Sequence, residues 1–527
     1  MDILTKFRTL IFLVLPGILL ISCQNGDPQQ EVTELETQTA SYDEPYRPQF
    51  HFTPAENWMN DPNGLVYHDG EYHLFYQHNP FGDTWGHMSW GHAVSPDLVH
   101  WEHLPVALPE ENNIMIFSGS AVVDHNNTSG FGSDENPPMV AIYTGHHTDQ
   151  DRQDQRIAYS TDNGRSWTKY EGNPVIDEEM ENFRDPKVIW HEDTDQWIMV
   201  VALPTEYKVR FYSSDNLKDW SLLSEFGPSG ATGGIWECPD LFELPVDGDS
   251  DRTKWVLQVD LNPGGPFGGS GAQYFVGHFD GETFVQDPET EGQTRWVDYG
   301  KDFYAVQSYT NIPRDDGRRI WLAWMNNWQY AQEIPTSPWR SAMTIPRSLS
   351  LQTFDDGIHL MQQPADELTQ LRGEHHHFEQ QQIDGDSNLL SEAGIRGNLL
   401  EIKARFNVGE ASVVGFRAAQ GNGEETLAAY NNDTGQLFVD RTNSGNTAFN
   451  EEFPGIHEAP LKTVEGEVTL HIFIDRSSIE LFGNGGRAVI TDRIFPSEGS
   501  DGISLYTEGG TAQLISMDVW QLESAWN

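Results

Sequence analysis

The chain has 527 residues, with 81 acidic residues against 31 basic ones and a formal net charge of −50 at pH 7. This length exceeds what one hydrophobic core normally serves, so we expect two folded domains. A net charge this negative repels polyanions and argues against nucleic acid as a partner. Hydrophobic residues make up 37% of the chain and aromatic residues 12%, which fits many short strands better than a helical bundle.

The N-terminal segment predicts export. Basic residues precede an apolar run from Leu10 to Ile21 that is too short for a membrane span, so residues 1–22 are typical of a signal peptide. The sequence Leu20-Ile21-Ser22-Cys23 resembles a bacterial lipobox, in which cleavage leaves Cys23 as a lipidated first residue. The alternative is ordinary cleavage near Ser22. A lipid on Cys23, at the cell envelope, is the one membrane association that the sequence predicts.

Residues 23–47 are rich in Gln, Glu, Thr and Asp, which predicts a flexible tether ahead of the first domain. Beyond it, short apolar runs alternate with Gly, Asn and Asp turns, and no convincing helix interrupts them. A repeat that combines Ser, Asp and Trp recurs at 95–101, 160–167 and 214–220. Repeats of this kind indicate the blades of a β-propeller, which we place at residues 48–355.

The pattern changes in the last third of the chain. Residues 356–374 form a predicted linker. Alternating apolar and polar residues then predict strands such as 468–474 and 479–482, which indicate a β-sandwich over residues 375–527. The fold class is therefore predicted to be all-β, a propeller followed by a sandwich.

Three acidic residues occupy equivalent places in a second internal repeat. Asp61-Pro62, Asp185-Pro186 and Glu237-Cys238-Pro239 each place an acid before a proline and an apolar strand. Proline is tolerated at the first residue of a strand and keeps its predecessor extended. A single acid of this kind is more readily explained as the start of a turn. Three of them at equivalent strand entrances are expected to converge on the propeller axis and form a pocket there.

The residues around these acids carry a family resemblance. Trp58-Met59-Asn60-Asp61-Pro62-Asn63-Gly64 resembles the signature of glycoside hydrolase family 32, and Arg184-Asp185-Pro186 and Trp236-Glu237-Cys238-Pro239 resemble its second and third motifs. The stretches 86–92 and 117–119 also fit. The resemblance runs from about Phe52 to the C-terminus and looks closest to bacterial exo-levanases and exo-inulinases. It implies a five-bladed β-propeller followed by a C-terminal β-sandwich.

The resemblance also implies a retaining mechanism on β-fructofuranosides. Retention requires a nucleophilic carboxylate and a protonated carboxyl on opposite sides of the scissile bond, roughly 5–5.5 Å apart. Asp61 is the implied nucleophile and Glu237 the implied acid/base. Asp185 is the third implied catalytic acid. We expect it to stay charged beside Arg184 and to hold fructosyl hydroxyls rather than to react.

A fructosyl pocket of amides, hydroxyls and aromatic rings is implied as well. The residues assigned to it are Asn60, Gln77, Trp85, Phe117, Ser118, Arg184, Asp302 and Trp328. Trp328 shares its segment with Trp324, and either indole could face the pocket.

No metal or cofactor is predicted. The adjacent histidines at 146–147 and 375–377 would point to opposite faces of a strand, and no spaced partner completes a metal site. Cys238 adjoins Glu237, yet retaining chemistry gives its thiol no step, so we interpret it as a small buried side chain. The motif at 474–482 is assigned to stability and domain docking.

The predicted function is the release of terminal fructose from β-fructans (levan or inulin), and from sucrose, by exo-attack. The same three acids would also serve a sucrose-preferring invertase or a fructosyltransferase. The stretch 82–88 looks closer to fructan-degrading members. A different class of function is a catalytically silent fructan-binding protein at the cell surface. Linkage preference, pH optimum and oligomeric state are left open by the sequence.

Overall fold

The structure is a computed structural model that describes residues 41–133 and 135–526. The predicted signal peptide, Cys23 and residues 24–40 of the predicted tether lie outside the described residues. In the part that is described, no helix has the length and apolar character needed to cross a membrane.

The last residues of the predicted tether belong to the folded chain. Arg47 is fully buried, and its guanidinium donates hydrogen bonds to Thr53 Oγ1 (3.0 Å), to the Pro54 carbonyl (2.7 Å) and to Glu44 Oε1 (2.8 Å). The Ala55 carbonyl is a fourth acceptor (2.9 Å). The tether boundary at residue 47 is therefore wrong, because a buried cation with four partners anchors this stretch to the domain.

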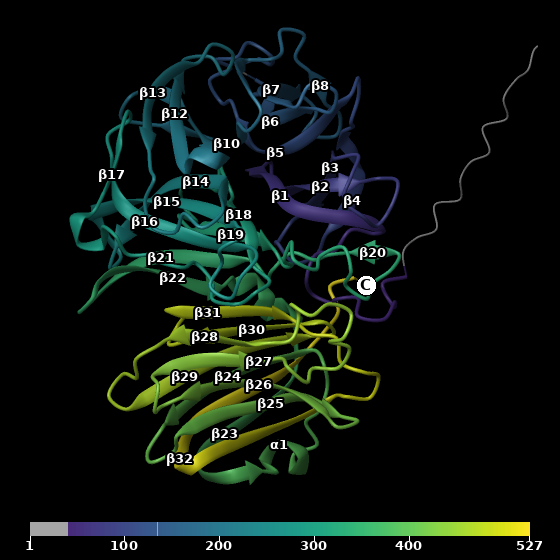
Figure 1. Cartoon of the computed structure of the whole chain (residues 1–527), viewed down its shortest axis with the longest axis vertical. Helices are drawn as coiled ribbons and strands as arrows, with labels where there is room; N and C mark the ends of the chain where they lie inside the picture. Colours follow the sequence, from purple (N-terminus) through teal and green to yellow (C-terminus); the bar gives the residue numbers. More distant parts are fainter. Residues whose placement is uncertain (1–40, 134, 527) are drawn as a thin grey trace, which may run out of the picture. The chain divides into compact units, whose positions relative to one another are not determined.

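The all-β prediction is confirmed (Figure 1). The described strands between residues 57 and 364 form four hydrogen-bonded sheets, and the largest divides into two antiparallel groups at the single parallel pair Val246–Leu351, which makes five groups in all. The first holds β1 (Asn57–His68), β2 (Glu71–Asn79), β3 (Ser89–Ser95) and β4 (Glu102–Leu108), with β20 (Trp339–Arg340) beside β1. The second holds β5 (Ile114–Val123), β6 (Met139–His147), β7 (Arg152–Ser160) and β8 (Thr168–Lys169), with β9 (Ile176–Met180) beside β7. The third holds β10 (Arg184–His191), β11 (Gln196–Leu203), β12 (Lys208–Ser214) and β13 (Ser221–Phe226).

The fourth group holds β14 (Ile235–Val246), β15 (Asp249–Asn262), β16 (Gly271–Phe279) and β17 (Phe284–Gln286). The fifth holds β18 (Tyr304–Ser308), β19 (Arg319–Trp324), β21 (Arg347–Phe354) and β22 (Gly357–Pro364). Short 3₁₀ turns lie at η1 (Pro204–Glu206), η2 (Pro288–Thr290) and η3 (Asp366–Leu371). The first strand of each group contacts the first strand of the next, and β18 contacts β1, so the five first strands close into a ring.

The predicted linker at 356–374 is not a linker. β22 lies inside it and pairs along its whole length with β21 of the fifth group. η3 follows directly, and β23 (Arg372–Ser387) opens the second domain. β22 contributes the buried side chains Leu360 and Met361, and pairing with β21 supplies its backbone hydrogen bonds. The sequence assignment failed because this pairing joins the strand to the fifth group.

The remaining strands form the β-sandwich. They are β24 (Leu400–Asn407), β25 (Val413–Gly421), β26 (Glu424–Asn431), β27 (Gln436–Asp440), β28 (Ile456–Pro460), β29 (Glu467–Asp475), β30 (Ser478–Gly483), β31 (Ala488–Arg493) and β32 (Gly502–Leu522), with the short helix α1 (Leu389–Glu392). β32 pairs with β25 through its first residues and with β23 and β24 through its later ones. One long strand thus pairs with strands throughout the sandwich. The core of the sandwich consists mainly of aliphatic side chains, with a few aromatic ones.

Buried ion pairs join the propeller to the sandwich. Arg347 on β21 donates to Glu480 Oε2 on β30 (2.6 Å), and Glu480 Oε1 lies 2.9 Å from His51 Nε2. His51 Nδ1 is in turn 2.8 Å from Asp475 Oδ2, and all four side chains are fully buried. Breaking such a pair leaves an uncompensated buried charge, so this contact favours one fixed docking of the two domains. The docking role predicted for residues 474–482 is confirmed.

Candidate active site

The three predicted acids meet where the innermost strands break their regular pairing. The register of β1 shifts between Met59 and Pro62, that of β10 between Arg184 and Lys187, and that of β14 between Glu237 and Asp240. β5 and β18 shift in the same way. A β-bulge re-aims side chains and increases local twist. All five inner strands thus depart from regular pairing, three of them at the predicted acids.

Asp61 lies on β1 with both carboxylate oxygens bound. Ser118 on β5 donates its hydroxyl to Oδ2 (2.6 Å), and Asn60 donates its amide to Oδ1 (3.0 Å). Burial raises the pKa of Asp61; these two hydrogen bonds oppose the shift, and the charge of Glu237 adds to it. The two donors fix the carboxylate in one orientation, as a nucleophile requires.

Glu237 on β14 is held by a cation and a phenol. Arg184 donates to Oε1 through Nε (3.0 Å) and Nη2 (2.8 Å), and Tyr304 donates its hydroxyl to Oε2. Tyr304 belongs to β18, so three inner strands fix this side chain. Sequence reasoning missed Tyr304, although the predicted residue Asp302 lies only two positions before it.

Asp185 differs from its prediction. Arg184 Nε lies 3.9 Å from Asp185 Oδ2, whereas its two short hydrogen bonds go to Glu237. Burial raises the pKa of Asp185 to about 7, although Arg184 opposes this shift; the charges of Glu237 and Asp61 raise it further. The sequence placed Asp185 beside a charged Arg184, but the short hydrogen bonds of that guanidinium go to Glu237, and burial has the larger effect on the pKa of Asp185.

Cys238 connects two of the acids. Its backbone N–H donates to Asp185 Oδ2 (3.0 Å), and its Sγ lies 3.7 Å from Asp61 Oδ2 and 3.6 Å from Asp185 Oδ2. Burial, with the surrounding carboxylates, raises the pKa of this thiol well above its usual range. Cys238 therefore stays a protonated, buried thiol, in line with the interpretation from the sequence.

A fourth acid, Asp260, lies beside Glu237 on the neighbouring strand β15. The two residues pair in the register of β14 and β15, so their side chains share one face. Asp260 is fully buried; its Oδ2 accepts a hydrogen bond from Gln258 Nε2 (2.9 Å), and its Oδ1 has no partner among the described residues. Burial holds the pKa of Asp260 well above its usual range, and the charges of Asp61 and Glu237 add to this shift.

Replacing Asp260 with asparagine is expected to stabilise the fold increasingly as the pH rises. Because the folded state raises the pKa of Asp260, wild-type protein binds a proton that the unfolded chain releases above about pH 4. The contribution of Asp260 to the unfolding free energy therefore falls with pH, by up to about 1.4 kcal/mol per pH unit at 25 °C, until the folded pKa is reached. Asp260→Asn removes this loss.

Unfolding measured between pH 4 and pH 8 on wild type and variant checks the expectation. Asp251→Asn, an exposed acid on the same strand, is the matched control. A stability difference that shrinks as the pH rises would mean that Asp260 is ionised in the folded protein.

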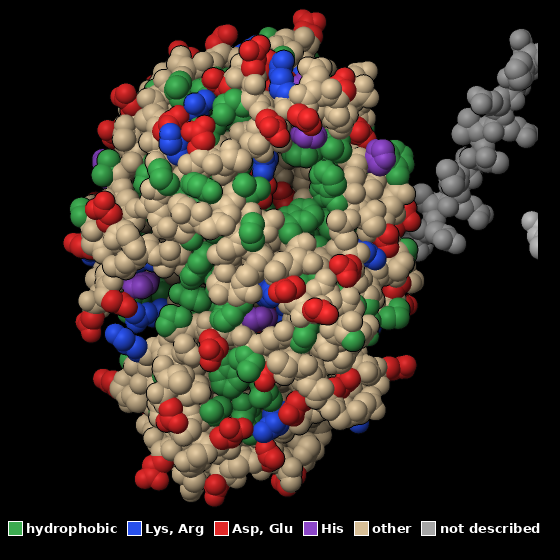
Figure 2. Space-filling model, in the orientation of Figure 1, with side chains coloured by type: hydrophobic (Ala, Val, Ile, Leu, Met, Phe, Trp, Pro, Cys, Tyr) green, Lys and Arg blue, Asp and Glu red, His purple; other side chains and the backbone are tan. Residues whose placement is uncertain are grey.

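The other predicted pocket residues lie near these acids, with one exception. Trp85 and Phe117 form an edge-to-face pair (ring centroids 6.2 Å apart), and the Trp328 ring stacks on Trp58, which precedes Asn60 on β1. Trp324 is fully buried, so Trp328 is the indole nearer the surface. Figure 2 shows one face of the molecule, with a hollow in its upper part that acidic and hydrophobic side chains border.

The side-chain amides of Asn60 and Gln77 are hydrogen-bonded within the protein. Asn60 accepts a hydrogen bond from Trp58 Nε1 (2.7 Å), and Gln77 donates to Asn63 Oδ1 (2.7 Å). Both side chains are buried. Their bonds hold the 58–63 stretch of β1 in place around Asp61.

Asp302 is the exception and does not reach the pocket. It is fully buried and accepts hydrogen bonds from Arg441, from the Tyr330 hydroxyl (2.8 Å) and from the Arg493 N–H (2.8 Å). Arg441 and Arg493 belong to the sandwich, so Asp302 joins the two domains. The sequence assignment failed because β18 begins only at Tyr304, and a buried arginine distant in sequence captures the carboxylate.

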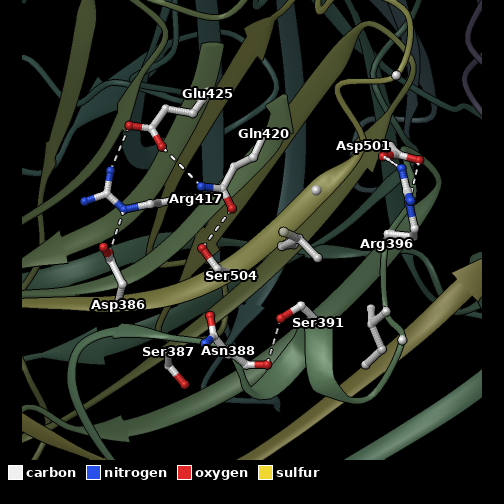
Figure 3. A pocket seen from close by; sticks show the side chains of 15 residues that line it. Asp386, Ser387, Asn388, Ser391, Arg396, Arg417, Gln420, Glu425, Asp501 and Ser504 are labelled. Carbon is white, nitrogen blue, oxygen red and sulfur yellow. Dashed lines mark hydrogen bonds and ion pairs between the residues drawn. The ribbon is translucent and has the colours of Figure 1, made fainter. Parts of the chain in front are cut away.

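A hollow of about 710 Å³ lies in the sandwich, away from these acids. Figure 3 shows that its charged side chains pair with one another. Arg417 binds Asp386 and Glu425, and Arg396 binds Asp501. These charges are already compensated, so this hollow offers none of the chemistry of the propeller site. Among residues 41–133 and 135–526, no three His, Cys, Asp or Glu side chains are grouped as metal ligands.

Two family models match almost the whole described chain. Residues 51–364 match the N-terminal domain of glycosyl hydrolases family 32, and residues 367–521 match the C-terminal domain of the same family. The chain belongs to glycoside hydrolase family 32. As a member of this family it is a glycosidase, and the resemblance seen in the motifs of Asp61, Asp185 and Glu237 is confirmed.

Similar proteins of the family share most of the chain. A levanase of Bacillus subtilis is 52% identical over 494 residues, which cover 92% of this chain and 72% of that protein. An extracellular exo-inulinase of Aspergillus ficuum is 45% identical and covers 92% of this chain and 96% of its own. Among solved structures, an exo-inulinase from Aspergillus awamori has a TM-score of 0.86 at 43% identity, with 92% of this chain and 100% of that chain covered.

A β-fructofuranosidase from Schwanniomyces occidentalis, solved with fructosyl-erythritol, has a TM-score of 0.82 at 37% identity. The matched region covers 93% of this chain and 100% of that one. The similarity to these proteins thus includes both the propeller and the sandwich described above.

Proposed function

We propose that this protein releases terminal fructose from β-fructans, and from sucrose, with retention of configuration. The observation that carries the proposal is the convergence of Asp61 and Glu237, each held in one orientation by partners from other strands. The similar proteins support the substrate class, since those named above are called levanase, exo-inulinase and β-fructofuranosidase.

Asp61 is the proposed nucleophile in the first step. Its carboxylate attacks C2 of the terminal fructosyl unit while Glu237 gives its proton to the leaving oxygen, so the C2–O bond breaks and a glycosyl ester forms on Asp61. The negative charge thereby moves from Asp61 to Glu237. Arg184 and Tyr304 already point at the Glu237 carboxyl, so they stabilise the charge that develops there without reorganisation.

Water completes the second step. Glu237 takes a proton from a water molecule whose oxygen attacks C2, and the ester bond to Asp61 breaks to release fructose. Asp185 is proposed to hold fructosyl hydroxyls during both steps. With a pKa of about 7 it can donate or accept a hydrogen bond near neutral pH.

Two other functions are weighed against this one. A sucrose-preferring invertase or a fructosyltransferase would use the same three acids and differs in the leaving group or acceptor it prefers. A silent fructan-binding protein would not need the Asp61–Ser118 and Glu237–Arg184 hydrogen bonds, both of which are present. We therefore favour hydrolysis of fructans.

Fructose is expected to be the main early product from levan or inulin. A pocket where five inner strands converge is closed on one side and accepts a chain end, with Trp85, Phe117 and Trp328 as its proposed wall. Rates on levan, inulin and sucrose, with chromatography of early digests, test both substrate and mode of attack. A ladder of short oligosaccharides ahead of free fructose would show endo-cleavage, and tight binding of fructan without any release of fructose would favour the silent binding protein.

Export with a lipid on Cys23 is part of the proposal. The names of the extracellular exo-inulinases support export, and the residues Leu20-Ile21-Ser22 before Cys23 support lipidation. Cys23→Ser is expected to move the protein from the membrane fraction to the soluble fraction. Unchanged fractionation would contradict the lipid anchor and leave ordinary cleavage near Ser22.

A further inference from the structure

The loop between β2 and β3 carries two exposed aromatic side chains. Phe81 is 77% exposed and Trp85 is 40% exposed. Of the large hydrophobic side chains that are exposed within residues 41–133 and 135–526, these two are the aromatic ones. Both therefore lie on one short loop, four residues apart, and Trp85 already contacts the pocket residue Phe117.

The loop is held rigidly although its tip is apolar. Asn79 accepts a hydrogen bond from the Phe81 N–H (3.0 Å) and donates another to the Thr84 carbonyl (2.8 Å), so one side chain spans the turn. The Trp58 N–H donates to the Gly82 carbonyl (3.0 Å). Because Trp58 lies three residues before Asp61 on β1, the loop is tied directly to the strand of the proposed nucleophile.

The Asp83–Arg340 ion pair is a second anchor of the loop, and His87 and Glu110 form a polar pair beside the Phe81 ring. Asp83 Oδ2 binds Arg340 Nη2 (3.1 Å), which fixes the loop from its other side. The Phe81 ring meets the ring of His87 edge to face (5.4 Å), and His87 Nδ1 is 2.8 Å from Glu110 Oε2. The surface around Phe81 thus combines one apolar face with groups that hydrogen-bond hydroxyls.

We propose that Phe81 is a platform for the leaving portion of a β-fructan chain, outside the terminal fructosyl pocket. This inference rests on the proposed function. The C–H face of one furanose ring would pack on the phenyl ring, while His87 and Glu110 would bind its hydroxyls. A protein partner is disfavoured, because Gly82, Asp83 and Thr84 around the ring offer too little apolar area for a protein interface.

The contact acts on binding rather than on chemistry. Because the leaving chain touches Phe81 equally in the ground state and the transition state, its loss raises KM and leaves kcat nearly constant. Phe81→Ala is expected to raise KM for long fructans by about threefold to tenfold, the range of one aromatic contact. The rise on sucrose, whose leaving group is a single glucose unit, is expected to be smaller. Phe81→Trp restores a flat ring and is expected to recover the KM for fructan.

Steady-state kinetics on long inulin or levan and on sucrose test the platform, with thermal unfolding to verify folding. Leu222→Ala is the matched control, since Leu222 is 53% exposed on β13 and its removal is expected to change neither KM. Equal losses of Phe81→Ala on both substrates, or no loss on fructan, would overturn the platform while the proposed function stands. If wild type releases no fructose from any fructan, the proposed function fails, and the platform with it.

Discussion

Asp61→Ala is expected to abolish turnover on every fructoside. The carboxylate supplies the bond that replaces the C2–O bond, and alanine offers no atom to form it, so kcat should fall by at least about 10⁴-fold. The fold should survive, because Asp61 pairs with Ser118 and Asn60 rather than with a buried cation. Steady-state kinetics with fructan and with an aryl fructoside check the loss.

A mechanism-based inhibitor locates the nucleophile independently of the substitution. In wild type the label is expected on Asp61, and mass spectrometry of the digested protein identifies the modified residue. Asp185 is the strongest competitor, since it also precedes a proline and its Oδ2 lies 3.6 Å from the same Cys238 Sγ that lies 3.7 Å from Asp61 Oδ2. A label on Asp185 would reverse the roles assigned to these two acids.

Glu237→Gln is expected to be nearly inactive on fructans yet to retain more activity on an aryl fructoside. The amide keeps the size of the side chain and its contacts with Arg184 and Tyr304 at least in part, but it has no proton to give to a fructosyl or glucosyl oxygen. A phenolate with a low pKa leaves without a proton, so formation of the ester on Asp61 proceeds. Kinetics on the two substrates measure the difference.

The second step must be separated from the first in this experiment. Glutamine cannot deprotonate the attacking water, so the ester is expected to accumulate and the aryl fructoside should give a burst followed by slow turnover. Burst kinetics resolve the two phases. Equal losses on both substrates without a burst would contradict the role of Glu237 as the acid.

Several features of this protein follow from the sequence alone. The composition and the turn-punctuated apolar runs predicted an all-β chain, and two family models together with the strand pairing confirm it. The repeated acid before a proline predicted that Asp61, Asp185 and Glu237 would meet. This local pattern was sufficient because each acid lies at a register shift of an inner strand, and these strands contact one another in a ring.

Other features depend on contacts between residues far apart in sequence, which local patterns do not encode. Tyr304 contacts Glu237, Asp260 faces it across a strand pair, and Arg184 turns its two short hydrogen bonds to Glu237 rather than to its neighbour Asp185. Asp302 was predicted in the pocket but lies at the domain boundary, because Arg441 of the sandwich binds its carboxylate. Sequence thus determined which strands bear the acids, whereas burial and long-range partners decided which side chains hold each acid.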